Sequence, residues 1–333
     1  MAKAKPADLV LSGGGVKFIG LVGAIVALMD AGYSFPRVSG VSAGSVVGAI
    51  LAASSKGDQL TSQEVKELAL SAPLSKWRDS GPVPVLGAAW GLVRDTSMFR
   101  GDAAYEWIRS ELKNLGIVHF GDLVLDENTL PEGRRHKLVV TVADLTAAQL
   151  VRLPWDYRRL YGLEPDEQLV ADAVRASMAI PFFYRPVKLT SVTGTTSTLV
   201  DGGVLSNFPI DTFDRFDGKP PRWPTFGITV LPRLNEGFSA VMPALKPLRF
   251  FEQTALLESL LTTVLAGHDQ THLNQPWVAA RAIAVESTDV GVLDFDIAAH
   301  RLEALYQKGY GAAEDFLSTW DWAGYLKRFR WAV

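Results

Sequence analysis

The chain has 333 residues, 48% of them hydrophobic, which is enough apolar material to fill the core of one large α/β domain. Its formal net charge of −3 provides no basic surface of the kind that nucleic-acid binding requires, so we exclude that class of function. The absence of cysteine excludes a disulfide framework, a thiolate metal site and a thiol nucleophile.

The N-terminal stretch MAKAKPADLVLSGGG shows neither a signal peptide nor a membrane anchor. Its apolar run is too short for a signal-peptide core, and no window of the chain approaches the roughly 20 apolar residues of a membrane span. We therefore expect a cytoplasmic protein.

The first part of the chain alternates strand and helix patterns, which is typical of an α/β protein. Residues 8–15, DLVLSGGG, predict a strand that runs into a glycine loop, and residues 19–32 predict a helix that ends at Gly32. A second strand and helix follow at residues 36–51, PRVSGVSAGSVVGAIL. Both helices are apolar on nearly all faces, as are helices that pack against a sheet.

Further elements follow after a more polar and irregular stretch at residues 54–125, which we interpret as a cap-like insertion. The patterns predict a hairpin at 137–144 and 149–154, a helix at 166–180 ended by Pro181, a strand at 197–203, a strand at 225–232, a helix near 247–272, a strand at 278–287 and a helix near 297–317. No repeat or linker divides the chain. We predict a single catalytic domain over residues 1–333, with an α/β extension over 216–333.

Residues 40–44, GVSAG, place a serine between two glycines where the second predicted strand turns into a helix. The glycines lack Cβ atoms that would collide with neighbouring backbone, so the Ser42 hydroxyl can project at a helix N-terminus. Backbone N–H groups and the helix dipole there favour the negative charge that develops during acyl transfer. We interpret Ser42 as a candidate nucleophile.

The glycine loop at residues 12–20, SGGGVKFIG, offers the other half of an acyl-transfer site. Its three consecutive glycines are Gly13, Gly14 and Gly15. Their N–H groups, joined by the N–H of Ala43, are a candidate oxyanion hole. The loop does not fit nucleotide-binding patterns, since GxGxxG would need glycine in place of Phe18 and the GK[ST] ending is missing. The alternative is a tight turn without a ligand.

A serine nucleophile needs a base, and no histidine lies in a glycine-flanked loop or beside a strand end placed near Ser42. The five histidines are His119, His136, His268, His272 and His300. In LVDGGVLSNFP, residues 199–209, Asp201 ends a predicted strand and two glycines allow the backbone to turn closely past another loop. An ordinary Asp-Gly turn is the alternative interpretation.

A carboxylate is a weak base in water, with a reference pKa near 3.9, so this interpretation requires an apolar environment around Asp201. Residues 175–186, RASMAIPFFYRP, contain two phenylalanines and a tyrosine that either wall such a site or belong to the core.

Together these motifs resemble those of the patatin-like phospholipases, in the order of that family and over about residues 7–215. The motifs are GGGVK at 13–17, GVSAG at 40–44, ASMAIPFFYRP at 176–186, DGG at 201–203 and NFP at 207–209. Residues 290–317 also resemble many bacterial members. The resemblance implies a serine lipid acyl hydrolase on a three-layer α/β/α sandwich with a mostly parallel central sheet.

The resemblance also implies a role for each motif residue. Ser42 is the nucleophile, Asp201 is the base, and the oxyanion hole consists of Gly13, Gly14, Gly15 and the Ala43 N–H. Lys17, Gly202 and Gly203 are candidate supporting residues, although a solvated lysine is an equal alternative for Lys17. The family commonly has glycine after its basic residue, where this chain has Phe18, which affects the end of the loop. No metal or organic cofactor is expected, because water is the second substrate of such a reaction.

Two alternatives stay open. An α/β-hydrolase with a Ser-His-Asp triad would recruit His268, His272 or His300, although such enzymes usually have several strands before the serine. The other alternative is a catalytically weak lipid-binding protein of the same fold, with Phe18 as the cause of the weakness.

The expected substrate is a fatty-acyl ester of a phospholipid or lysophospholipid, hydrolysed at a lipid surface with peripheral membrane contact. Residues 81–93, GPVPVLGAAWGLV, carry no charge and either dip into lipid or form a buried loop. Residues 320–333 mix aromatic and basic side chains and are a second candidate for contact with an anionic bilayer.

Overall fold

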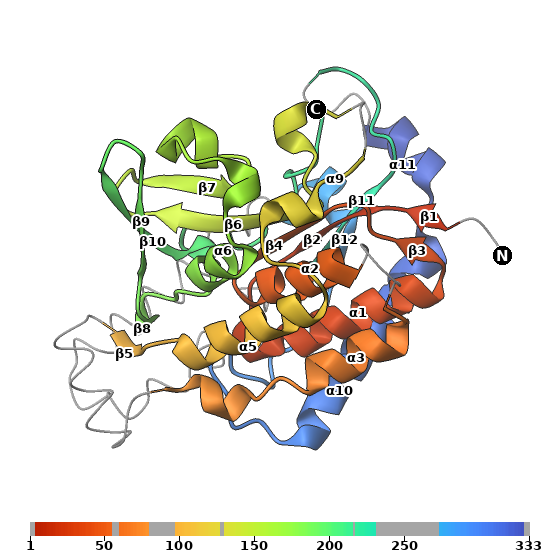
Figure 1. Ribbon diagram of the computed structural model, residues 1–333. Helices are drawn as coiled ribbons and strands as arrows, with labels where there is room; N and C mark the ends of the chain where they lie inside the picture. Colours follow the sequence, from red (N-terminus) through yellow and green to blue (C-terminus); the bar gives the residue numbers. More distant parts are fainter. Residues whose placement is uncertain are drawn as a thin grey trace.

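A central sheet organises the chain in the computed structural model, which describes residues 4–54, 60–79, 97–126, 130–215, 217–230 and 273–329 (Figure 1). Within these ranges the strand order is β12-β11-β2-β4-β6-β10-β9, and β7 pairs with β6 outside this order. The strands are β2 (Asp8–Leu11), β4 (Val38–Val41), β6 (Leu138–Asp144), β7 (Gln149–Leu153), β9 (Val187–Thr190), β10 (Thr196–Asp201), β11 (Thr225–Thr229) and β12 (Ala282–Ala284).

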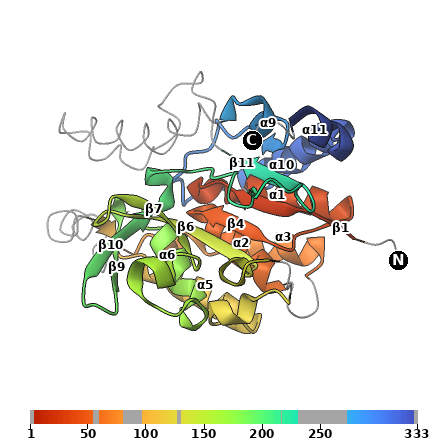
Figure 2. The same cartoon turned by 90° about the horizontal axis from the view of Figure 1, so that it is seen from above.

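The sheet is mostly parallel, as predicted. The strands from β12 through β11, β2 and β4 to β6 run parallel, whereas β10 and β7 pair antiparallel with β6, and β9 pairs antiparallel with β10. Seen from above, β9 and β10 lie at the end of the sheet opposite β11 (Figure 2). Two separate two-stranded parallel sheets accompany the central sheet. They pair β1 (Lys5–Pro6) with β3 (Tyr33–Ser34) and β5 (Ser97–Phe99) with β8 (Phe182–Tyr184).

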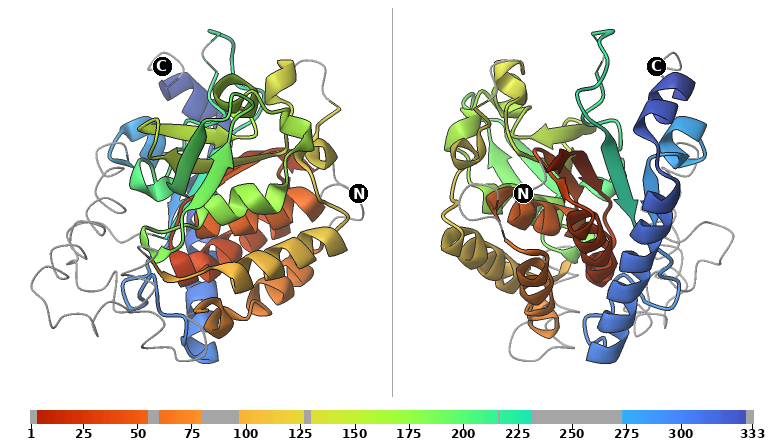
Figure 3. Two further views of the ribbon diagram at one scale, coloured as in Figure 1. Left: turned by 60° about the vertical axis from the view of Figure 1, so that its left-hand side comes forward. Right: turned by 90° about the vertical axis from the view of Figure 1, so that its right-hand side faces the viewer.

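One face of the sheet is covered by helices, among them the two that contain the predicted apolar runs. They are α1 (Phe18–Asp30), α2 (Ala43–Ser54), α6 (Val170–Ser177) and α10 (Ala299–Thr319), with α3 (Ser62–Leu70) and α5 (Asp102–Asn114) packed outside them. α1 and α10 lie in close contact, because a Cβ at Gly23 would collide with the carbonyl of Tyr306 and a Cβ at Gly309 with that of Gly20. α10, in blue, extends along one side of the molecule (Figure 3).

The other face is covered by residues 204–215 and by α9 (Pro276–Ala279), with α11 (Trp322–Phe329) next to α9. Phe208, Ile210 and Val278 form a cluster there, packed so closely on β11 that a Cβ at Gly227 would collide with Phe208. The strands are thus buried on both sides. In β2, for example, Leu9 and Leu11 join the main core and Val10 the opposite cluster. The α/β/α sandwich is confirmed.

Short helical turns complete the described chain: residues Gly15–Lys17, Leu74–Trp77, Phe120–Leu123, Glu132–Arg134, Tyr157–Tyr161, Pro165–Glu167 and Gly202–Val204. Within the described ranges, no helix combines the length and the apolar character needed to cross a bilayer.

Some elements differ from the sequence predictions. The strand predicted at 278–287 was wrong at its start, because Pro276 begins the short helix α9 and β12 covers only Ala282–Ala284. In the stretch 54–125, interpreted as a cap-like insertion, the buried residues of α3 and α5 belong to the main core. The helix predicted near 247–272 lies outside the described residues, as does the segment 81–93.

Candidate active site

Ser42 occupies the sharp turn between β4 and α2, as the motif predicts. Its backbone has a φ of 51°, a left-handed conformation that costs a residue other than glycine about 1–2 kcal/mol. A Cβ at Gly40 would collide with the carbonyl of Gly44, and a Cβ at Gly44 would lie 2.5 Å from the carbonyl oxygen of Ser12. The two glycines of GVSAG are therefore required for the strand and helix to meet at this angle.

The strained turn is held by Ser177, a residue to which the sequence analysis gave no role. The Ser42 N–H donates to Ser177 Oγ at 2.8 Å, and the Ser177 hydroxyl donates to the carbonyl oxygen of Thr141 at 2.7 Å. Ser177 is fully buried at the end of α6. On the other side, Ser45 donates its hydroxyl to the Ser42 carbonyl oxygen at 2.6 Å. Both polar groups of the Ser42 backbone thus have fixed partners.

Replacing Ser177 by alanine should weaken this support. The variant leaves the Ser42 N–H and the Thr141 carbonyl without their buried partner, so we expect the free energy of unfolding to fall by about 1–3 kcal/mol. If Ser42 is the nucleophile, kcat should fall about tenfold, with KM nearly unchanged, because its position is less well defined. Urea unfolding and steady-state kinetics measure the two effects. Ser54→Ala, at the far end of α2, is the matched control, and equal behaviour of the two variants would contradict a positioning role.

Asp201 and Ser42 lie at the same end of the sheet, with the strand β6 between them. In the sheet, Asp201 of β10 pairs with Val142 of β6, while Val41 of β4 pairs with Thr141 of β6. A Cβ at Gly202 would collide with the Thr141 carbonyl oxygen, so the turn after Asp201 passes directly over β6. The predicted need for glycine after this aspartate is therefore explained by close backbone approach.

The Asp201 carboxyl group is almost completely enclosed, with 1% of the residue exposed. Its Oδ1 accepts the Gly203 N–H at 2.8 Å, and its Oδ2 makes no conventional hydrogen bond within the described part of the chain. Burial raises the pKa of Asp201 to about 7, while the nearby Ser42 hydroxyl and the Gly203 N–H oppose this rise. A carboxyl group with this proton affinity, adjacent to a serine hydroxyl, has the properties of a general base at neutral pH.

The glycine loop lies against Ser42. A Cβ at Gly13 would lie 3.1 Å from the Ser42 Cβ and would collide with Asn207. The Gly13 N–H donates to the Asn207 carbonyl oxygen at 3.2 Å, and Asn207 Nδ2 donates to the Gly13 carbonyl oxygen at 3.5 Å. Asn207, quoted above only as part of NFP, therefore joins the glycine loop to the segment that begins at Asp201. Because the Gly13 N–H already donates to Asn207, it is not free to donate to an oxyanion, and Gly13 contributes to the shape of the loop instead.

The other N–H groups of the predicted oxyanion hole are differently placed. No described residue accepts a hydrogen bond from the N–H of Gly14, Gly15 or Ala43, and Ala43 is the first residue of α2. The loop is closed by Val292, whose carbonyl oxygen accepts the Val16 N–H at 3.0 Å. Gly15 has a φ of 56°, and a Cβ there would collide with the same carbonyl. The N–H groups of Gly14, Gly15 and Ala43 are thus left without an acceptor among the described residues.

Comparison with known sequences decides the family. The profile described as "Patatin-like phospholipase" matches residues 9–214, more than half of the chain. The chain belongs to this family. Membership supports a lipid hydrolase activity.

Similar proteins span nearly the whole patatin-like chain. The uncharacterized protein YqhO of Bacillus subtilis (strain 168) is 35% identical over 318 residues, which are 95% of this chain and 99% of YqhO. Among solved structures, VipD from Legionella pneumophila is 18% identical with a TM-score of 0.46, covering 95% of this chain and 67% of VipD. The ExoU-SpcU complex from the type III secretion system of Pseudomonas aeruginosa is 19% identical with a TM-score of 0.46, covering 95% and 52%.

The departure of this patatin-like chain from its family at Phe18 is accommodated by packing. Phe18 begins α1 and is buried next to side chains of α1, α2 and α5, among them Val22, Val46 and Trp107. Lys17, which precedes it, is fully buried, so the solvated alternative is wrong. The loop therefore passes into α1 without a glycine at position 18.

The described histidines lie apart from the candidate site of this patatin-like chain. His136 is buried, its Nε2 lies 2.7 Å from Asp166 Oδ1, and burial lowers its pKa. His119 and His300 are exposed, and no hydrogen bond or ion pair joins a described histidine to Ser42 or Asp201. His268 and His272 lie outside the described residues.

The aromatic residues after α6 serve the core. Phe183 stacks on Phe295 with ring centroids 5.5 Å apart, and the Tyr184 hydroxyl donates to the Trp77 carbonyl oxygen at 3.1 Å. Both side chains are buried in the main cluster, whereas Phe182 is half-buried. Of the two interpretations of this segment, the structure favours packing for Phe183 and Tyr184.

Proposed function

We propose that this chain hydrolyses fatty-acyl esters of phospholipids or lysophospholipids through a dyad of Ser42 and Asp201. The observation that supports the proposal best is the buried Asp201 carboxyl, whose pKa is raised to about 7 beside the Ser42 hydroxyl. An ordinary surface aspartate is a much weaker base than this group.

In the proposed first half-reaction, Ser42 Oγ attacks the ester carbonyl carbon while its proton passes to Asp201. The carbonyl oxygen becomes an oxyanion, and the N–H groups of Gly14, Gly15 and Ala43 are its proposed donors. When the intermediate collapses, the ester C–O bond breaks and the leaving alcohol takes the proton from Asp201. An acyl-enzyme on Ser42 remains.

In the second half-reaction, water attacks the acyl-enzyme and Asp201 accepts a proton from that water. Collapse of the second intermediate releases the fatty acid and returns the proton to Ser42 Oγ. The Gly203 N–H holds Asp201 Oδ1 throughout, so the proton exchange takes place at Oδ2. No group beyond the chain and water takes part.

Contact with a lipid surface is part of the proposal. The segment 81–93, predicted to dip into lipid, lies outside the described residues. α11 supports a peripheral contact, because Lys327 and Arg328 are exposed there and Trp322, the first residue of the same helix, is half-buried.

A substrate panel tests the proposed function. Wild-type protein should release fatty acid from phosphatidylcholine or lysophosphatidylcholine vesicles and should be labelled by a fluorophosphonate, whereas Ser42→Ala prepared in parallel should do neither. Triacylglycerol emulsions and short-chain soluble esters are the comparison substrates. Hydrolysis restricted to the soluble esters would contradict the lipid substrate, and equal fatty-acid release by both preparations would show a contaminating activity.

The pH dependence follows from the Asp201 pKa. Asp201 must be deprotonated to accept the serine proton, so kcat/KM should rise with pH, reach half of its maximum near pH 7 and level off above it. Initial rates on a soluble ester between pH 5 and 9 measure this profile. A rate that is constant over this range would show that a group with a different pKa acts as the base.

A further inference from the structure

A cavity of about 370 Å³ lies at the end of the sheet opposite Ser42. It is lined by Asp8 and Thr225, the first residues of β2 and β11, and by Arg37, just before β4, whereas Ser42 follows the carboxyl end of β4. Cavities of this size are typical of small-molecule sites. The proposed hydrolytic site does not account for it.

Two adjacent aromatic rings along one wall of this cavity have a cation at either end. The Arg134 guanidinium lies 4.2 Å from the centroid of the Trp155 ring, which meets Phe213 edge-on at 6.0 Å. The Arg37 guanidinium in turn lies 4.5 Å from the Phe213 ring centroid. All four side chains line the cavity, so an occupant would meet both ring surface and positive charge.

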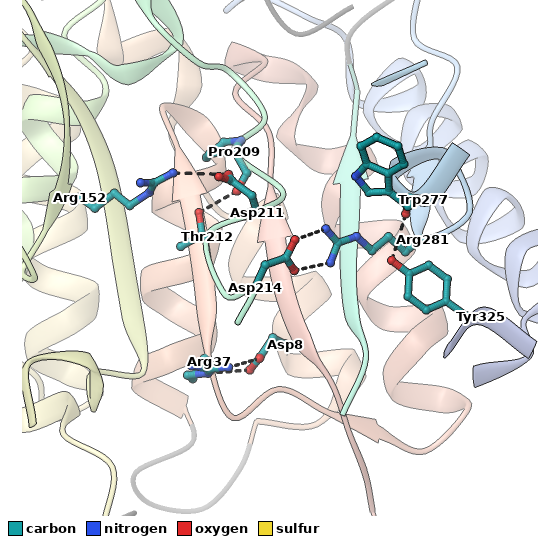
Figure 4. Close-up of polar contacts among 10 residues, drawn as sticks. All are labelled: Asp8, Arg37, Arg152, Pro209, Asp211, Thr212, Asp214, Trp277, Arg281 and Tyr325. Atoms are coloured by element: carbon teal, nitrogen blue, oxygen red, sulfur yellow. Dashed lines mark hydrogen bonds and ion pairs between the residues drawn. The ribbon is translucent and has the colours of Figure 1, made fainter. Parts of the chain in front are cut away.

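The three carboxylates of the lining are already paired with arginine. Asp8 accepts from Arg37 Nε at 3.0 Å, and Asp214 accepts two hydrogen bonds from Arg281, each of 2.6 Å, as Figure 4 shows. Asp217 accepts from Arg215 Nε at 2.9 Å. These carboxylates are therefore largely neutralised within their own pairs.

Arg134 differs from these arginines, because it forms no ion pair with a described carboxylate. Desolvation and the nearby positive charges of Arg152 and Arg37 lower the pKa of Arg134, while the Asp156 carboxylate opposes part of this shift. The Trp155 Nε1–H is also buried without a hydrogen-bond partner among the described residues. A cation without an ion-pair partner and a donor without an acceptor, both judged among the described residues, thus stand together at one cavity.

We propose that this cavity binds a small organic anion, with its carboxylate or phosphate on Arg134 and its apolar or ring-bearing body against Trp155 and Phe213. The planar guanidinium matches two oxygens of such a group, and its contact with the indole keeps it oriented for that interaction. The indole N–H of Trp155 is an additional donor. The inference does not depend on the proposed hydrolase activity.

Calorimetric titration of the full chain at low ionic strength tests the proposal, with sodium benzoate, AMP and inorganic phosphate as probes. Benzoate or AMP should bind saturably at one site, and more tightly than inorganic phosphate, which has no ring. Arg134→Gln should weaken the binding about tenfold or more, and Trp155→Phe, which keeps a ring but lacks the N–H, about threefold.

The matched control is Arg109→Gln, which removes an exposed arginine of α5 and should bind the probes as the wild type does. Absence of saturable binding by both organic anions would overturn the proposal, and so would unchanged affinity in Arg134→Gln. Inorganic phosphate binding as tightly as AMP would overturn the role of the rings. If Arg134→Gln unfolds, Arg134→Lys replaces it. That variant keeps the charge without the planar fork and should still bind more weakly than the wild type.

Discussion

Ser42→Ala should lower phospholipid hydrolysis by about 10⁴-fold and abolish labelling by a fluorophosphonate. The substitution removes only the oxygen that would form the acyl-enzyme, and loss of a serine nucleophile in enzymes of this kind costs factors of this order. Fatty-acid release from phosphatidylcholine vesicles and mass spectrometry of the labelled protein provide the two measurements. Labelling that persists in Ser42→Ala would show that another residue is the nucleophile.

The stability of two variants at this position separates chemistry from folding. Ser42→Ala keeps the Cβ and therefore the strain at a φ of 51°, so its free energy of unfolding should stay close to that of the wild type. Ser42→Gly should raise that free energy by about 1 kcal/mol, because glycine adopts this conformation without strain. Both variants should be inactive. A Ser42→Gly variant less stable than Ser42→Ala would contradict the assignment of strain to this turn.

Asp201→Asn should lower kcat/KM about 10³-fold or more across the pH range. The amide retains an oxygen for the Gly203 N–H but cannot accept the serine proton, so the geometry survives while the base is lost. Kinetics on a soluble ester measure the loss. His268→Ala and His272→Ala are the controls and should keep most of the activity, whereas a loss of similar size in either would favour a triad.

Asp201→Asn, which lowers activity, should gain stability relative to the wild type as the pH rises. Burial raises the Asp201 pKa from its ordinary value of 3.8 to about 7, so the folded protein holds a proton that the unfolded chain has released at intermediate pH. The contribution of Asp201 to stability is thus fully present below about pH 4 and is lost as the pH rises through about 7. Asp201→Asn has no such titration. Urea unfolding from pH 4 to 8 should therefore show the variant gaining stability relative to the wild type.

The two strand-helix units at the start of the chain follow from local pattern and were predicted correctly. The apolar run before each glycine motif and the continuous apolar helices after it indicate buried parallel strands with crossover helices, and β2-α1 and β4-α2 have this form. The order of the strands and the antiparallel placement of β10 beside β6 depend on contacts between distant segments. Local periodicity contains no information about those contacts.

The candidate site likewise combines residues that local pattern predicts with residues whose role depends on contacts between distant segments. Ser42 and Asp201 stand in glycine-rich turns that are visible in the sequence, but Ser177 and Asn207 act through hydrogen bonds to backbone groups 135 and 194 positions away. A serine at the end of a helix and an asparagine in a loop are common, so their residue types alone indicate no such role. Only their inclusion in the motifs ASMAIPFFYRP and NFP singled out the segments that contain them.

The closure of the glycine loop by Val292 has a consequence for where the functional unit ends. Val292 and α10 lie far beyond residue 214, where the match to the family profile stops, yet one clamps the loop and the other supports the helix that follows it. A fragment cut at residue 214 would contain every motif of the family and would lack the brace that keeps those motifs in shape. We therefore expect the smallest autonomous unit of this protein to extend through α10.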